Sequence, residues 1–149
     1  EEISKELIKK KSLFILGKGK SYPIAREGSL KIKEITYIHA EGYSGSSLKH
    51  GPFGLLEPDF PVILIAPKDD TYAKMTNVYQ EVLSRKAKVY FITDDHECNY
   101  PNSIILPSNK HFIYLLSIIP LQLIAYYVAI QKGYNPDFPR NLAKVVTVE

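Results

Sequence analysis

The sequence predicts an α/β fold: a three-layer sandwich in which a mostly parallel sheet is flanked by helices. Short, uniformly apolar runs alternate along the chain with longer stretches of helical periodicity, a pattern typical of strands that are covered on both faces. Ligands of such sheets bind beyond the carboxyl ends of the strands, which places residues 17–23 near any site. The predicted strands are 12–16, 61–66, 87–93 and 103–106, and the predicted helices are 2–10, 21–41, 71–85 and 112–131.

The composition indicates one folded domain. The chain has 149 residues, of which 45% are hydrophobic and 23% charged, so it is long enough to bury a core. A net charge of +3 argues against a nucleic-acid partner. The single cysteine, Cys98, excludes an internal disulfide and fits the cytoplasm. No signal peptide opens the chain, and it starts with Glu1, so we expect a piece of a longer protein.

The helix predicted over residues 24–41 carries charges where a packed face is expected. On a helical wheel, apolar and charged side chains share one arc of about 140°. Either the charges form ordinary ion pairs at the edge of the packed face, or the arc borders a cleft suited to proton transfer. The arc contains Leu30, Glu41, Glu34, Glu27, Ile38, Lys31, Ile24 and Ile35, and the opposite side carries Ala25, Thr36, Ser29, Lys33 and Arg26.

Two loops contain residue types that bind ions. Residues 17–19 (GKG) could hold an anion at a helix N-terminus, but they lack the full spacing of a dinucleotide or phosphate loop. Residues 94–98 (DDHEC) are metal-ligand types without metal-ligand spacing. We expect an exposed turn there, and neither a metal nor a cofactor.

Residues 112–131 contain no charged side chain and are long enough to cross a bilayer. Pro120, Gln122 and Gln131 interrupt the segment, and strand–helix units precede it. We therefore predict a buried helix and no membrane partner. An all-apolar helix on a small domain also indicates a subunit interface.

The C-terminal tail places Lys144 among apolar residues. A lysine near a terminus is by default exposed and without a role. However, a lysine held among apolar groups has a lowered pKa and can serve as an amine nucleophile. The residues themselves leave both possibilities open.

Three separated motifs, in residues 27–35 (EGSLKIKEI), 48–52 (LKHGP) and 139–144 (PRNLAK), carry a family resemblance. From about residue 13 to residue 149, the chain closely resembles the C-terminal sugar isomerase domain of glucosamine-6-phosphate synthases (glutamine:fructose-6-phosphate aminotransferases). The resemblance implies a flavodoxin-like sugar isomerase fold and a sugar phosphate as substrate.

The resemblance also implies roles for individual residues. Lys144 matches the lysine that forms an imine with open-chain fructose 6-phosphate, and Glu34 matches the carboxylate that moves the proton between C1 and C2. His50 matches the histidine that opens the sugar ring and that reaches the site from a neighbouring subunit. Lys31 and Ala143 are the expected substrate-binding residues.

Further domains are implied that these 149 residues do not contain. In the family, a Ser/Thr-rich loop of a preceding isomerase domain grips the sugar phosphate, and an N-terminal glutaminase domain supplies ammonia. We therefore expect the C-terminal module of a longer enzyme, a homodimer or higher oligomer, that catalyses little on its own. Ser46 and Ser47 stand where the family commonly has Gly-Glu, which puts the hydrogen bonding of that loop in question.

The leading hypothesis is the isomerase half of an enzyme that makes glucosamine 6-phosphate from fructose 6-phosphate and glutamine-derived ammonia. A second is another sugar-phosphate isomerase or deglycase of the same fold. A third is a non-catalytic sugar-phosphate sensor that regulates a partner. The lysine-bearing C-terminal motif favours the first, and a sensor would be free to lose Glu34 and Lys144, which are both present.

Overall fold

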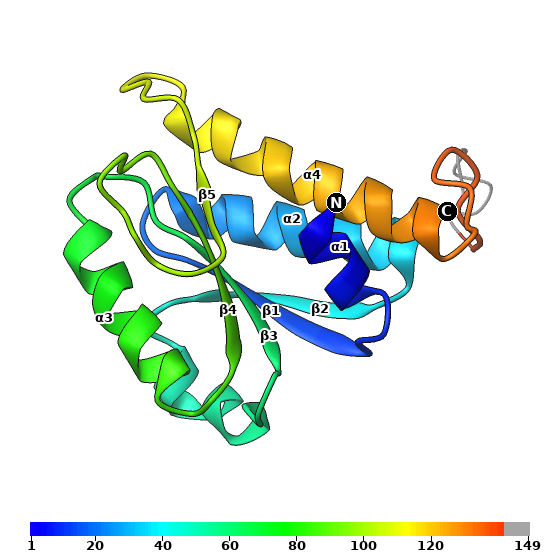
Figure 1. Ribbon diagram of the computed structural model, residues 1–149, viewed down its shortest axis with the longest axis horizontal. Helices are drawn as coiled ribbons and strands as arrows, with labels where there is room; N and C mark the ends of the chain where they lie inside the picture. Colours follow the sequence, from blue (N-terminus) through cyan, green and yellow to red (C-terminus); the bar gives the residue numbers. More distant parts are fainter. Residues whose placement is uncertain (142–149) are drawn as a thin grey trace, which may run out of the picture.

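A sheet of five parallel strands organises the molecule (Figure 1). The computed structural model describes residues 1–141. Its strands pair in the order β2-β1-β3-β4-β5, and every pair is parallel. This is the strand order of flavodoxin-like, doubly wound folds, so the predicted fold class is confirmed. The strands are β1 (Ser12–Gly17), β2 (His39–Ser44), β3 (Pro61–Ile65), β4 (Lys88–Thr93) and β5 (Ser103–Ile105).

Helices cover both faces of the sheet, as Figure 1 shows. One face carries α1 (Glu2–Leu7), α2 (Ser21–Thr36) and α4 (Ile113–Gln131). The other carries α3 (Tyr72–Leu83) and the short 3-10 turns η1 (Leu48–His50) and η2 (Pro52–Leu55). Because side chains alternate along a strand, β1 sends Leu13 and Ile15 into the first core and Phe14 and Leu16 into the second.

The prediction for residues 37–44 was wrong. The helix ends at Thr36 instead of continuing to residue 41, and residues 39–44 form β2, an edge strand, rather than a last helical turn and a loop. The Thr36 hydroxyl donates to the carbonyl of Ile32 (2.7 Å) and accepts from the amide of Ile38 (3.2 Å). Tyr37 then adopts the left-handed conformation, with φ 60°. These local bonds offer the chain an alternative to continued helix.

The packed face of α2 also differs from the prediction. Leu30, expected in the packed arc, is 41% exposed. On the side expected to face solvent, Ala25, Ser29 and Thr36 are buried, and only Arg26 and Lys33 are exposed as predicted. The reason is close packing against α4: a Cβ atom on Gly28 would lie only 2.3 Å from Cδ1 of Leu121. Small side chains let the backbones of α2 and α4 approach each other closely, so the face of α2 with small residues packs against α4 instead of the face with bulkier apolar residues. The buried residues of α2 are Ser21, Ala25, Gly28, Ser29, Ile32 and Thr36.

α4 is a core helix on one side only. Within residues 1–141 it is the one helix that length and composition would allow to cross a membrane. Leu121, Ala125 and Val128 are fully buried against the sheet and α2, which confirms the predicted burial for that side. The other side exposes large apolar side chains at helical spacing, a feature typical of a surface that is covered in an assembly. They are Leu115, Ile119, Leu123, Tyr126 and Ile130.

Candidate functional site

The carboxylate and the amine predicted on α2 form an ion pair. The Nζ atom of Lys31 lies 2.7 Å from Oε2 of Glu34 and 3.6 Å from Oε1 of Glu27. The Glu34 side chain is 21% exposed and that of Lys31 is 34% exposed. The hydrogen bond to Glu34 raises the pKa of Lys31, although partial burial opposes this. Lys31 is therefore charged at neutral pH and holds the Glu34 carboxylate in place.

Glu34 faces a cavity of about 320 Å³ at the end of α2. Lys33 lines this cavity and also a neighbouring one of about 500 Å³, whose lining includes Arg26 and Glu27. The charged arc of α2 therefore fits both interpretations. Glu27 and Glu34 each form an ion pair with Lys31, and each also lines a cavity. The remaining lining residues of the smaller cavity are Tyr37, Arg140 and Asn141.

The segment after α4 is docked beside Glu34 through Tyr37. The backbone amide of Arg140 donates to the Tyr37 hydroxyl at 2.8 Å, and the Arg140 guanidinium carbon lies 4.0 Å from the centre of the Tyr37 ring. As a result, residues 140 and 141 line the same cavity as Glu34. Ala143 and Lys144, both predicted site residues, lie outside the described residues.

His50 lies on the other face of the sheet. It is exposed in η1, whose Leu48 belongs to the core packed against α3. The adjacent Lys49 pairs with Glu81 of α3, with 2.6 Å between Nζ and Oε1. Glu34 belongs to α2, on the opposite face. Within one chain the structure therefore does not bring His50 and Glu34 together.

The loop before His50 forms its own hydrogen bonds despite its unusual serines. The Lys18 ammonium donates to the Ser46 hydroxyl, which ties this loop to the one that follows β1. The Ser47 amide donates to the carbonyl of Ser44 (2.8 Å), and the His50 amide donates to the carbonyl of Ser47 (3.1 Å). Ser46 and Ser47 thus leave the turn before His50 well formed.

The loop at residues 94–98 is less exposed than predicted. Asp95 is buried and accepts hydrogen bonds from Nζ of Lys68 (2.9 Å) and from the Tyr72 hydroxyl (2.8 Å). These bonds lower the pKa of Asp95. Asp95 therefore ties the loops after β3 and β4 to α3. Among residues 1–141, no group of three or more His, Cys, Asp or Glu side chains could hold a metal ion.

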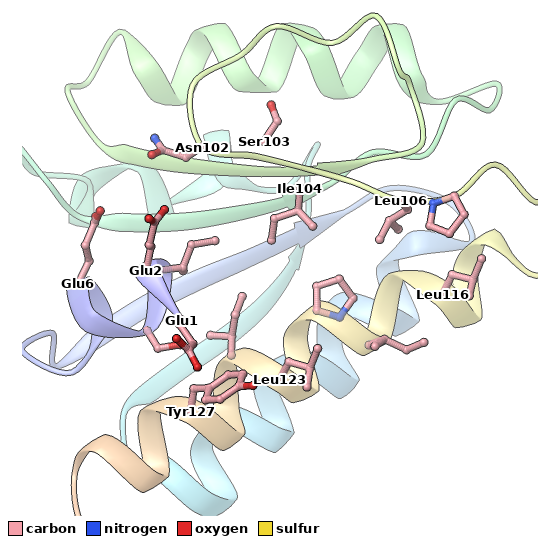
Figure 2. Close-up of a pocket in the computed structure, with 16 residues that line it drawn as sticks. Glu1, Glu2, Glu6, Asn102, Ser103, Ile104, Leu106, Leu116, Leu123 and Tyr127 are labelled. Atoms are coloured by element: carbon pink, nitrogen blue, oxygen red, sulfur yellow. The ribbon is translucent and has the colours of Figure 1, made fainter.

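A larger cavity, of about 830 Å³, lies between α1, β5 and α4 (Figure 2). Its lining is mostly apolar, and none of the predicted site residues contributes to it. Leu123 belongs both to this lining and to the exposed apolar side of α4. Figure 2 shows Leu123 and Tyr127 on the side of α4 that faces Ile104 and Glu2, with Leu116 farther along the helix near Leu106. The cavity continues the exposed apolar surface of α4, and its charged lining residues are Glu1, Glu2 and Glu6.

Four residues at the Glu34 cavity were not predicted as site residues, among them Lys33, which was expected on the solvent side of α2. Tyr37 was not singled out because local sequence patterns reveal neither its left-handed conformation nor its contact with Arg140, which lies 103 positions later in the chain. Arg140 and Asn141 were recognised only as members of the 139–144 motif. What could have pointed to them is that the same motif contains Lys144, which the resemblance assigns to the same site as Glu34.

Comparisons with known proteins found a matching family and several relatives. The family described as "SIS domain" matches residues 6–132. A protein of Acanthamoeba polyphaga mimivirus named "Probable glutamine--fructose-6-phosphate aminotransferase (isomerizing)" is 55% identical over 142 residues, which cover 93% of this chain and 23% of that protein. The glutamine--fructose-6-phosphate aminotransferase (isomerizing) of Chlorobaculum tepidum is 46% identical over 154 residues, covering 100% of this chain and 25% of that protein.

A solved structure extends the comparison. The C-terminal domain of glucosamine-fructose-6-phosphate aminotransferase from Francisella tularensis superposes with a TM-score of 0.79 at 39% identity, covering 90% of this chain and 39% of that one. The chain thus spans about a quarter of the length of the curated relatives it matches.

Proposed function

This chain belongs to the SIS domain family, and on that basis we propose that it is the C-terminal part of the isomerase region of a cytoplasmic glutamine–fructose-6-phosphate aminotransferase. In that role it takes part in converting fructose 6-phosphate and glutamine-derived ammonia to glucosamine 6-phosphate. One observation carries the proposal: Glu34, held by Lys31, faces a cavity that is also lined by the segment leading to Lys144.

The proposed chemistry uses a base and an amine. The amine of Lys144 condenses with the C2 carbonyl of the open-chain sugar, releasing water and forming an imine that makes the C1 protons more acidic. Ammonia then displaces the lysine nitrogen from C2, which leaves an imine of ammonia on the sugar and frees the Lys144 amine. Glu34 removes a C1 proton from this imine and returns it to C2 while the C1 hydroxyl becomes the aldehyde, which is the ketose-to-aldose step. Lys31 keeps the carboxylate oriented, and Ala143 completes the substrate-binding residues.

A partner chain supplies the remaining parts in this proposal. Because His50 and Glu34 lie on opposite faces of one sheet, the ring-opening histidine comes from a second copy. The exposed apolar side of α4 and the 830 Å³ cavity beside it support a further packing partner, which we take to be the preceding isomerase domain. That domain would also grip the sugar phosphate.

Subunit complementation tests whether Glu34 and His50 act across two copies. Full-length Glu34→Gln and His50→Asn proteins are each expected to be nearly inactive. After mixing, unfolding and refolding, half of the dimers are mixed, and each mixed dimer holds one site with both wild-type residues. We therefore expect recovery of about a quarter of the wild-type rate of glucosamine 6-phosphate formation.

A matched mixture controls for nonspecific recovery. Glu34→Gln mixed with Lys144→Ala should stay inactive, because both residues belong to the same copy's site. If the Glu34→Gln and His50→Asn mixture also stays inactive although mixed dimers form, His50 does not act across the interface. If the wild-type full-length protein makes no glucosamine 6-phosphate, the proposed function itself is wrong.

A further inference from the structure

The contact between Tyr37 and Arg140 joins two segments that both belong to the proposed site. Tyr37 directly follows α2, which carries Glu34, and Arg140 belongs to the segment that leads to Lys144. The Arg140 amide donates to the Tyr37 hydroxyl at 2.8 Å, and the guanidinium carbon lies 4.0 Å from the ring centre. One side chain therefore holds Arg140 by a hydrogen bond and by a cation–π contact.

Tyr37 is itself held from two directions. Its amide donates to the carbonyl of Lys33 at 3.3 Å, which closes the last turn of α2. Its ring packs against that of Tyr134, with 4.9 Å between the ring centres. Next to it, Nζ of Lys132 donates to the carbonyl of Thr36 at 3.1 Å. Tyr37 is thus held by its amide and by its ring at the junction of α2 and the segment after α4.

Lys144 follows Asn141 by three positions in the sequence. Three residues of extended chain span at most about 11 Å between Cα atoms. Asn141 lines the cavity that Glu34 faces. Residues 140 and 141 therefore lie beside Glu34, a few residues before Lys144 in the sequence.

We propose that Tyr37 is a positioning residue that docks residues 140 and 141 beside Glu34 and so brings the Lys144 amine to the sugar. This inference rests on the proposed function and adds a residue to it. The two contacts of Tyr37 can be removed in steps. Tyr37→Phe loses the hydrogen bond to the Arg140 amide and keeps the ring, whereas Tyr37→Ala loses both.

Limited trypsin digestion of the full-length protein measures the docking without any chemistry on a sugar. Trypsin must take the Arg140 side chain into its own pocket, so cleavage after Arg140 requires release from Tyr37. Cleavage should accelerate about threefold in Tyr37→Phe and at least about tenfold in Tyr37→Ala, since the cleavage rate follows the population of the released state. Mass spectrometry of the released C-terminal peptide gives the rate.

Borohydride trapping with saturating fructose 6-phosphate measures the consequence. The initial rate of adduct formation on Lys144 should fall at least about tenfold in Tyr37→Ala, with Tyr37→Phe between it and the wild type. Tyr72 offers a matched control, because its hydroxyl also makes one hydrogen bond (2.8 Å, to Asp95), but in α3 on the other face of the sheet. Tyr72→Phe and Tyr72→Ala should leave both rates at the wild-type values, whatever they do to the melting temperature.

Each outcome decides one question. Faster cleavage together with slower trapping, graded from Phe to Ala, supports the proposal. Unchanged cleavage in Tyr37→Ala overturns the docking, and faster cleavage with unchanged trapping overturns the role in catalysis. If the wild type forms no adduct on Lys144, the proposed function fails, while the digestion still decides the docking.

Discussion

Replacing Glu34 by glutamine in the full-length protein is expected to lower the ketose-to-aldose rate about a thousandfold. Glutamine keeps the size of the side chain and can still bond to Lys31, but it cannot accept the C1 proton. The value to measure is kcat for glucosamine 6-phosphate formation at saturating substrate. Because the proposed role of Glu34 is to move a proton after the sugar is bound, KM should change little by comparison.

Glu27→Gln is the matched control for this change. Glu27 is also a carboxylate on α2 that pairs with Lys31, but the pair is longer (3.6 Å) and the side chain is 47% exposed. An exposed ion pair of this kind contributes little to the position of Lys31, so the Glu27→Gln variant should keep most of the wild-type kcat. Equal losses in the two variants would mean that the charge around Lys31 matters and that Glu34 is not the base.

Gly17→Ala is expected to destabilise the fold strongly, although it adds only one methyl group. A Cβ atom at this position would lie 2.2 Å from the carbonyl oxygen of Ser21 and 2.9 Å from the backbone nitrogen of Tyr22. These are backbone atoms of the first turn of α2, so they cannot move aside as a side chain would. Relieving the overlap means shifting α2 away from the sheet, at a cost of about 3 kcal/mol or more.

Thermal unfolding of the full-length protein measures this cost, as a melting temperature lowered by about 10 °C. Gly54→Ala is the control, because a Cβ atom there meets nothing within 4 Å and the backbone does not need the left-handed region. Equal melting temperatures of the Gly17→Ala and Gly54→Ala proteins would contradict the close contact between β1 and α2.

Much of the fold could be predicted from local patterns because β1, β3 and β4 are covered on both faces. Their uniformly apolar sequences distinguish them from helices and turns, and their predicted positions hold within a residue or two. β2 was missed because an edge strand with mixed polarity lacks this signal, and because Ile38 and Glu41 fall on the same helical-wheel arc as residues of α2.

The site was harder to predict because it depends on contacts distant in sequence. The charged arc of α2 pointed correctly to Glu34 and Lys31 as an ion pair, but the packed face was assigned to the wrong side. Packing between α2 and α4 rests on Gly28 and Leu121, and no periodicity within one helix reveals such a contact. Tyr37 enters the site only because residue 140 returns to it.

The central claim is that the Lys144 amine and the Glu34 carboxylate act on the same open-chain sugar. Borohydride reduction of the wild-type full-length protein in the presence of fructose 6-phosphate, followed by peptide mass spectrometry, tests it directly. We predict a sugar adduct on the peptide that contains Lys144, and none in Lys144→Arg. Reversible sugar-phosphate binding without any adduct, or an adduct on Lys31 instead, would contradict the claim.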